Sequence, residues 1–254
     1  PQSFEDILDL IDVPQTILNT DQSRQVISVC KKYLAEIVPE LSTTTPDIMG
    51  PMSASLCIAT VMNKNRFDLK FRVDDTFSEV AQLVYWFVHT MLTPEHMPRM
   101  EGPILYICDL LKKLSFMSTI VLCDEESLTK FEISAIHILF EELDPEFLLK
   151  HATATFLADL YHLSYIQRKF LLNELTTNFL RLPTKKAEAR NYRTHRGFNI
   201  LVFTAVAVKF AREESDANVL ARELVLRVTS NFDATAKTLL ELLVEDLIHL
   251  LPFG

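Results

Sequence analysis

The chain has 254 residues, of which 48% are hydrophobic and only four are glycine, and its formal net charge is -9. So little glycine argues against glycine-rich phosphate loops and against sandwiches or barrels whose turns need positive φ, so a nearly all-helical protein is expected. The acidic balance argues against nonspecific binding of polyanions over the whole surface. The four cysteines lack CxxC spacing and lie mostly in apolar stretches, which favours reduced core thiols in a cytosolic or nuclear protein.

Apolar residues recur at spacings of three and four along the chain, between short breaks rich in Pro, Gly, Asp, Ser and Thr. This period predicts about eleven helices. Ser3 is a candidate N-cap, and Pro103 and Pro145 stand at favoured first-turn positions. The predicted ranges, in chain order, are 3–12, 21–38, 52–64, 75–92, 103–120, 127–142, 145–162, 165–181, 198–213, 215–231 and 234–251.

Short links between these helices favour antiparallel neighbours, and a helix pair takes about 40 residues, the period of HEAT and armadillo repeats. We therefore expect an all-α fold, an α-solenoid of HEAT-like helical hairpins, although no sharp internal repeat is visible. Residues 1–254 are interpreted as a single segment, with a subdivision into 1–182 and 198–254 around a connector at 183–197. Because the chain starts without Met and stops just after a helical pattern, we expect it to be part of a longer protein.

The sequence contains no motif typical of a catalytic, cofactor or metal site. The seven histidines never occur as HExxH or beside a cysteine at ligand spacing, and the chain has no GxxxxGK[ST], GxGxxG or GxSxG motif. Paired acids such as Glu125-Glu126 and Glu213-Glu214 are typical of solvated helix ends. The sequence Val84-Tyr-Trp-Phe-Val88 is interpreted as core. We therefore expect no catalytic, cofactor or metal site, no small-molecule substrate and, since no run of 18 apolar residues occurs, no membrane span.

One segment has the opposite charge from the rest of the chain. Residues 181–196 contain six basic residues and a single acid, Glu188. The six basic residues are Arg181, Lys185, Lys186, Arg190, Arg193 and Arg196. Such a cluster on an acidic protein can bind a phosphate backbone or an acidic protein segment, because arginine bonds two oxygens at once. The alternative is a solvated, flexible loop between solenoid helices.

The residues around this cluster resemble the cohesin loader family, the Nipped-B or adherin proteins, in its early HEAT region. The similar segments are Arg168-Lys-Phe-Leu-Leu-Asn-Glu-Leu175, Phe179-Leu-Arg-Leu-Pro-Thr-Lys-Lys186, Arg190-Asn-Tyr-Arg193, Val202-Phe-Thr-Ala-Val-Ala-Val208, Leu56-Cys-Ile-Ala-Thr-Val-Met62 and Val73-Asp-Asp-Thr-Phe-Ser-Glu-Val80. Their order agrees with the family. The resemblance covers most of the chain but is specific only at 168–193, and the linker after Arg193 is shorter than in the family.

The resemblance implies a non-enzymatic scaffold, nuclear and chromatin-associated, that helps load cohesin onto DNA and stimulates its ATPase. The partners it implies are the cohesin ATPase heads, the kleisin subunit and duplex DNA. A tetratricopeptide co-loader is expected to bind outside this segment. The positions that carry over are Lys185, Lys186, Arg190 and Arg193.

Two alternatives remain open at this stage. One is another HEAT or armadillo scaffold, such as a transport receptor or an assembly platform, that grips a peptide or helix. The other is a helical regulatory domain of a larger enzyme whose catalytic part lies elsewhere. Binding partners separate the first alternative from a cohesin loader, and the full-length context separates the second.

Overall fold

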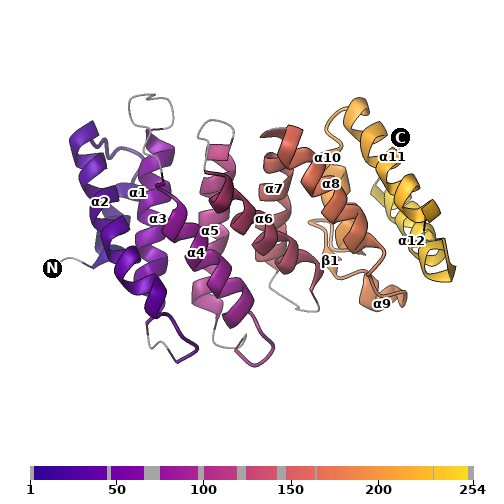
Figure 1. The fold of residues 1–254 in the computed structure, drawn as a ribbon, viewed down its shortest axis with the longest axis horizontal. Helices are drawn as coiled ribbons and strands as arrows, with labels where there is room; N and C mark the ends of the chain where they lie inside the picture. Colours follow the sequence, from indigo (N-terminus) through magenta and orange to yellow (C-terminus); the bar gives the residue numbers. More distant parts are fainter. Residues whose placement is uncertain are drawn as a thin grey trace. The chain divides into compact units, whose positions relative to one another are not determined.

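The computed structural model describes residues 3–44, 47–65, 75–96, 100–118, 124–141, 147–163, 165–230 and 232–250. The chain forms two compact units, residues 1–138 and residues 139–254, and the described part is mostly helical (Figure 1). The all-α prediction is therefore confirmed. The division between the units falls inside one helix, and the predicted connector 183–197 lies within the second unit.

The first unit contains α1 (Phe4–Asp12), α2 (Thr20–Ile37), η1 (Val38–Glu40), α3 (Met49–Lys64), α4 (Ser78–Trp86), the π-helical turn η3 (Phe87–Met91) and α5 (Glu101–Ser118). The helix α6 (Glu125–Phe140) leads from this unit into the second. As predicted, Ser3 caps α1, in a capping box with Asp6. The helix expected at 75–92 begins three residues late, and its last turn is π-helical.

The core of the first unit is built around α3. Every residue from Pro51 to Met62 is buried, because α1, α2 and α5 all pack against this helix. Small side chains such as Ala54 and Ala59 let the neighbouring helices approach closely. Gly50 serves the same purpose, since a Cβ there would lie 2.7 Å from the Tyr33 hydroxyl oxygen. Cys30, Cys57 and Cys108 are buried in this core and form no disulfide among the described residues, so their predicted place in the core is confirmed.

The second unit contains α7 (Phe147–Leu163), α8 (Tyr165–Phe179), the single-turn helix α9 (Lys186–Ala189), strands β1 (Tyr192–Arg193) and β2 (Asn199–Ile200), α10 (Val202–Phe210), α11 (Glu214–Ser230) and α12 (Ala234–Leu250). The helix α7 packs on α8 and α10, while α8 packs on α11. Tyr161 stacks on Phe210 with ring centroids 4.3 Å apart, and Phe179 contacts Phe203 at 4.5 Å.

The prediction of a helix from 198 to 213 is wrong at both ends. Its first residues instead form β2, which pairs antiparallel with β1, and the helix α10 covers only Val202–Phe210. The reason is local: Gly197 adopts a φ of +86°, a left-handed conformation that favours glycine, and reverses the chain into a tight hairpin. Two-residue strands are too short to show an alternating pattern in the sequence.

One buried carboxylate stands out in α6. Glu132 is 4% exposed, and its Oε1 atom has no hydrogen-bond partner among the described residues. Burial raises the pKa of Glu132 to about 7, because removal from water disfavours the charged form. A carboxylic acid that stays neutral in the folded protein but ionises in the unfolded chain makes folding less favourable as the pH rises.

Replacing Glu132 with glutamine is expected to stabilise the protein at pH 8 and to change little at pH 5. The penalty of the native acid begins near its unfolded pKa and reaches a plateau above pH 7, at about 3 kcal/mol. Urea unfolding of the native protein and the variant at the two pH values measures the difference in the free energy of unfolding. Glu125→Gln, an exposed acid on the same helix, is the control. A gain from Glu132→Gln that is equal at both pH values would contradict the assignment.

Candidate functional site

The basic connector is an ordered hairpin rather than an open loop. After α8 the chain turns through Arg181 and Pro183, makes the single turn of α9, and then passes through β1 and β2. The Thr194 amide and hydroxyl both donate to the Phe198 carbonyl, each at 2.9 Å, and the Gly197 amide donates to the Thr194 carbonyl at 2.9 Å. The backbone of this segment is therefore held by its own hydrogen bonds.

On one side the connector is tied to α7. Lys150, which is 2% exposed, donates from Nζ to the Asn191 carbonyl at 3.0 Å. The His151 Nδ1 atom lies 3.1 Å from the hydroxyl of Tyr192. Tyr192 itself is buried, and burial raises the pKa of its phenol to about 12, so it stays neutral at physiological pH.

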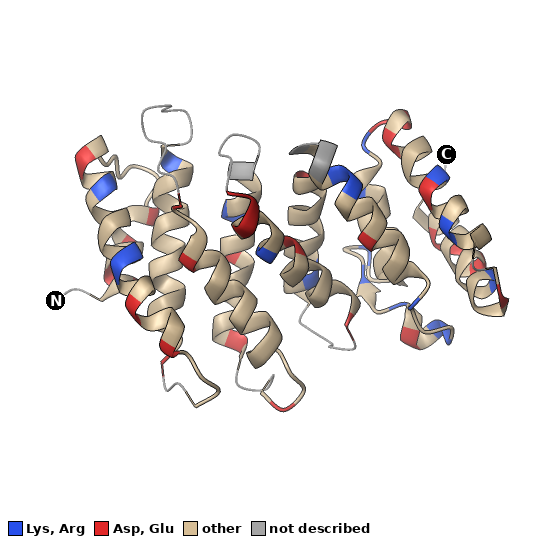
Figure 2. Ribbon diagram, in the orientation of Figure 1, with Lys and Arg blue, Asp and Glu red and all other residues tan. Residues whose placement is uncertain are grey.

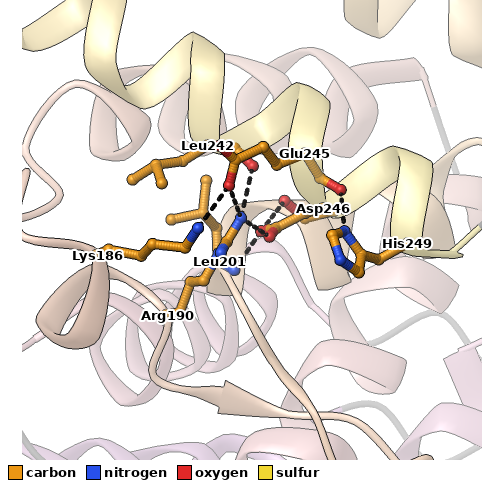
Figure 3. A network of polar contacts seen from close by, with 8 residues as sticks. Lys186, Arg190, Leu201, Leu242, Glu245, Asp246 and His249 are labelled. Atoms are coloured by element: carbon orange, nitrogen blue, oxygen red, sulfur yellow. Dashed lines mark hydrogen bonds and ion pairs between the residues drawn. The ribbon is translucent and has the colours of Figure 1, made fainter.

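On the other side the connector is tied to α12 by a buried ion pair (Figure 3). The Arg190 guanidinium donates to Asp246 at 2.6 Å, to Glu245 at 3.0 Å and to the Leu242 carbonyl at 3.3 Å. The Asp246 side chain is 2% exposed and that of Arg190 is 12% exposed. Both charges are therefore removed from water, and each depends on the other for compensation.

Asp246 also holds the start of α10. One carboxylate oxygen accepts from the Leu201 backbone amide at 2.7 Å and from the Thr204 hydroxyl at 3.2 Å. Leu201 is the N-cap residue of α10 and has no capping side chain of its own. A carboxylate placed there from another helix satisfies donors at the helix start and interacts favourably with the helix dipole. Asp246 thus joins α12, α10 and the connector at one point.

Both lysines of the predicted basic cluster also have acidic partners. Lys186 donates to Glu245 at 2.8 Å, and Lys185 pairs with Glu188 at 3.0 Å within the single turn of α9. Hydrogen bonds from Lys186 and then from Arg190 hold the pKa of Glu245 below its usual value. Both lysine side chains remain mostly exposed, at 62% and 79%, so an incoming anion can still reach them.

The remaining three predicted residues, Arg181, Arg193 and Arg196, are exposed, and none has an ion pair among the described residues. The local sequence shows one acid beside the six basic residues, but the structure adds two carboxylates from α12, which is distant in the sequence. Figure 2 shows charges of both signs on and around α9. The structure thus separates Arg190, which serves the fold, from five exposed cations on a fixed backbone.

A second polar cluster joins α7, α8 and α11. Asp216 lies 3.8 Å from His162 Nδ1 and 3.6 Å from an Arg168 nitrogen, and Arg168 covers the Tyr161 ring at 4.9 Å. Burial, followed by the charge of Arg212, lowers the pKa of His162, so its ring is neutral near pH 7. These groups were not singled out together in the sequence, since they come from three separate helices. These contacts satisfy the cluster only in part, because the buried His162 Nε2 atom and the buried Tyr161 hydroxyl have no hydrogen-bond partner among the described residues.

The described residues offer no group of three or more His, Cys, Asp or Glu side chains that could hold a metal ion. None of the helices that the structure describes is both long and apolar enough to cross a membrane. No family model matches the chain, and the search of curated proteins gives no match either. The resemblance to the cohesin loader family therefore stays a prediction that rests on the residues themselves.

Removing the Asp246 carboxylate is expected to destabilise the second unit strongly. Asp246→Ala leaves the Arg190 guanidinium and the Leu201 amide without their buried acceptor, which costs about 3–5 kcal/mol for a broken buried pair. Urea unfolding followed by circular dichroism measures the loss. Glu245→Ala is the control, because this neighbouring acid also contacts Arg190 but is solvated, and its loss should be much smaller. Equal effects would contradict the central role of Asp246.

Proposed function

We propose that the chain is part of a non-enzymatic scaffold of the cohesin-loader kind, a HEAT-like α-solenoid that binds cohesin and duplex DNA in the nucleus. The observation that carries the DNA contact is that Arg193 and Arg196 are exposed on the connector, whose backbone contacts two helices, and that Arg181 is exposed just before it. The resemblance at 168–193 supplies the cohesin partner. In this proposal the protein promotes loading and stimulates the ATPase of its partner.

The pattern of helix contacts supports a solenoid within each unit. In the first unit α3 packs on α1, α2 and α5, and in the second α7 packs on α8 and α10. Partners are thus near neighbours in the sequence, as in repeat proteins whose units contact only adjacent units. A helix array of this kind exposes long surfaces for other macromolecules and needs no enclosed active site.

The chemistry of the connector supports a phosphate-bearing partner. Arginine presents a planar fork of N–H donors that matches two phosphate oxygens, and it keeps its charge at any physiological pH. Because the backbone around Arg193 is held by the hairpin and by α7 and α12, little ordering entropy is lost when a partner binds. The net charge of -9 repels polyanions elsewhere, so binding is expected to concentrate on this segment and to weaken steeply with salt.

Reversing the three exposed arginines tests the DNA contact. The triple variant Arg181→Glu, Arg193→Glu, Arg196→Glu is expected to bind a short fluorescent duplex at least about tenfold more weakly. Each phosphate contact that is lost also removes the release of counterions that favours binding. Fluorescence anisotropy between about 50 and 200 mM salt measures the affinity and the salt slope, which should fall by about 0.9 per contact. Arg190 is left intact, so that folding is not disturbed.

The matched control reverses three exposed basic residues elsewhere, Lys32, Lys169 and Arg222, and so changes the net charge by the same amount. Thermal unfolding confirms that both variants are folded. If the control loses as much affinity as the test variant, the effect is one of overall charge and the connector assignment fails. Pull-downs with purified cohesin heads and with kleisin are a separate experiment. If the protein binds neither of them, the cohesin part of the proposal is overturned.

A further inference from the structure

Arginine precedes a Ser or Thr by three residues at three places in the chain. These places are Arg181 before Thr184, Arg212 before Ser215 and Arg227 before Ser230. A basophilic protein kinase binds such an arginine in an acidic pocket of its own, while the acceptor hydroxyl lies next to the γ-phosphate of ATP. Spacing alone does not separate the three sites, but their contacts do.

Two of the three sites are unsuitable. Arg212 is paired with Asp159 at 2.6 Å, and the residues between it and Ser215 are both glutamate, which an acidic pocket repels. Ser230 donates its hydroxyl to the Leu226 carbonyl at 2.8 Å at the end of α11. Its arginine, Arg227, donates to the side chain of Asn173.

Thr184 has neither obstacle. Its side chain is exposed, no hydrogen bond of its hydroxyl is recorded among the described residues, and it lies outside regular secondary structure between α8 and α9. Arg181 is exposed without an ion pair in the same part of the structure, and Lys185 follows Thr184 with an extended backbone at φ -71° and ψ 121°. The nearest acid in the sequence is Glu188, four residues beyond Thr184.

We propose that Thr184 is a phosphorylation site for a basophilic Ser/Thr kinase. In the reaction the Thr184 hydroxyl oxygen attacks the γ-phosphorus of Mg-ATP, the bond to the β-phosphate oxygen breaks, and ADP leaves. The hydroxyl proton passes to the carboxylate base of the kinase. Apart from the Thr184 hydroxyl, no group of this chain takes part in the transfer, and Arg181 contributes only to recognition by the kinase.

Access to the kinase requires only a small local opening. Two turn bonds hold the residues before Thr184, from the Arg181 amide to the Asn178 carbonyl at 3.1 Å and from the Leu182 amide to the Phe179 carbonyl at 3.3 Å. The Leu182 side chain is 6% exposed, so it must leave its site for the segment to extend. A single turn at the end of a helix opens at far lower cost than the whole fold.

The phosphate would lie within the exposed cations of the connector. It carries a charge of about -1.5 to -2 and would compete with Glu188 and Glu245 for the ammonium groups of Lys185 and Lys186. This consequence rests on the proposed DNA contact: modification of Thr184 cancels local positive charge and weakens binding of the duplex. The phosphorylation itself does not depend on that function.

The experiment treats the intact protein with Mg-ATP and a purified basophilic kinase and maps the phosphate by tandem mass spectrometry. One phosphate is expected on Thr184, none in Thr184→Val, and a rate at least about tenfold lower in Arg181→Ala, which lacks the bidentate contact to the kinase. Arg196→Ala is the matched control, because it removes an exposed arginine of the same connector that does not precede Thr184 by three residues. Its rate should equal that of the native protein.

Absence of phosphate on Thr184, while the kinase modifies a control peptide, overturns the proposal, as does equal labelling of Ser215 or Ser230. An unchanged rate in Arg181→Ala overturns the role of that arginine. Duplex binding is measured separately on unmodified and phosphorylated protein, with a loss of at least about tenfold expected. If the unmodified protein fails to bind DNA, the proposed function fails and the site stands. If the phosphorylated protein binds the duplex as tightly as the unmodified protein does, the coupling between modification and DNA binding fails.

Discussion

The second unit of this protein depends on one buried carboxylate. Asp246 on α12 accepts from the Arg190 guanidinium, from the Leu201 amide and from the Thr204 hydroxyl. A carboxylate removed from water costs several kcal/mol unless its oxygens are compensated, and here one donor from the connector and two from the start of α10 provide that compensation. The dependence is mutual at the start of α10, which has no capping side chain of its own, whereas the nearly buried Arg190 also donates to Glu245 and to the Leu242 carbonyl.

This arrangement explains how a basic segment keeps a defined shape on an acidic protein. Without the pair between Arg190 and Asp246, mutual repulsion of six cations would favour an extended, solvated loop. With it, the connector is held between α7 and α12, and the hairpin fixes where Arg193 and Arg196 leave the backbone. One arginine is used inside the fold, and the others are presented outside it.

The helices could be predicted from the sequence because their apolar period is a local property. The range predicted as 234–251 is observed as Ala234–Leu250, and the range 215–231 as Glu214–Ser230. The hairpin at 192–200 could not be predicted in this way, since two residues per strand show no period, although Gly197 marks the turn. In addition, the two acidic partners that α12 provides lie more than fifty residues away from the connector in the chain, beyond the reach of any local pattern.

One signal for the buried pair was nevertheless present in the sequence. Asp246 stands four residues after Leu242 and three after Leu243, on the apolar face of α12, where a charge is costly unless a cation meets it. A basic cluster elsewhere in an otherwise acidic chain is the natural source of that cation. The same reasoning could not choose Arg190 among six candidates, because that choice is made by the course of the connector through α9 and β1.

The structure also changes what the resemblance to the cohesin loader family means at the residue level. Of the four positions that carry over, Arg190 serves the fold, Lys185 and Lys186 have carboxylate partners, and only Arg193 is exposed without one among the described residues. A basic pattern of this kind can therefore be maintained by folding alone. Evidence for a nucleic-acid contact has to come from the arginines that the fold does not use, and two of these, Arg181 and Arg196, lie outside the four positions that the resemblance carries over.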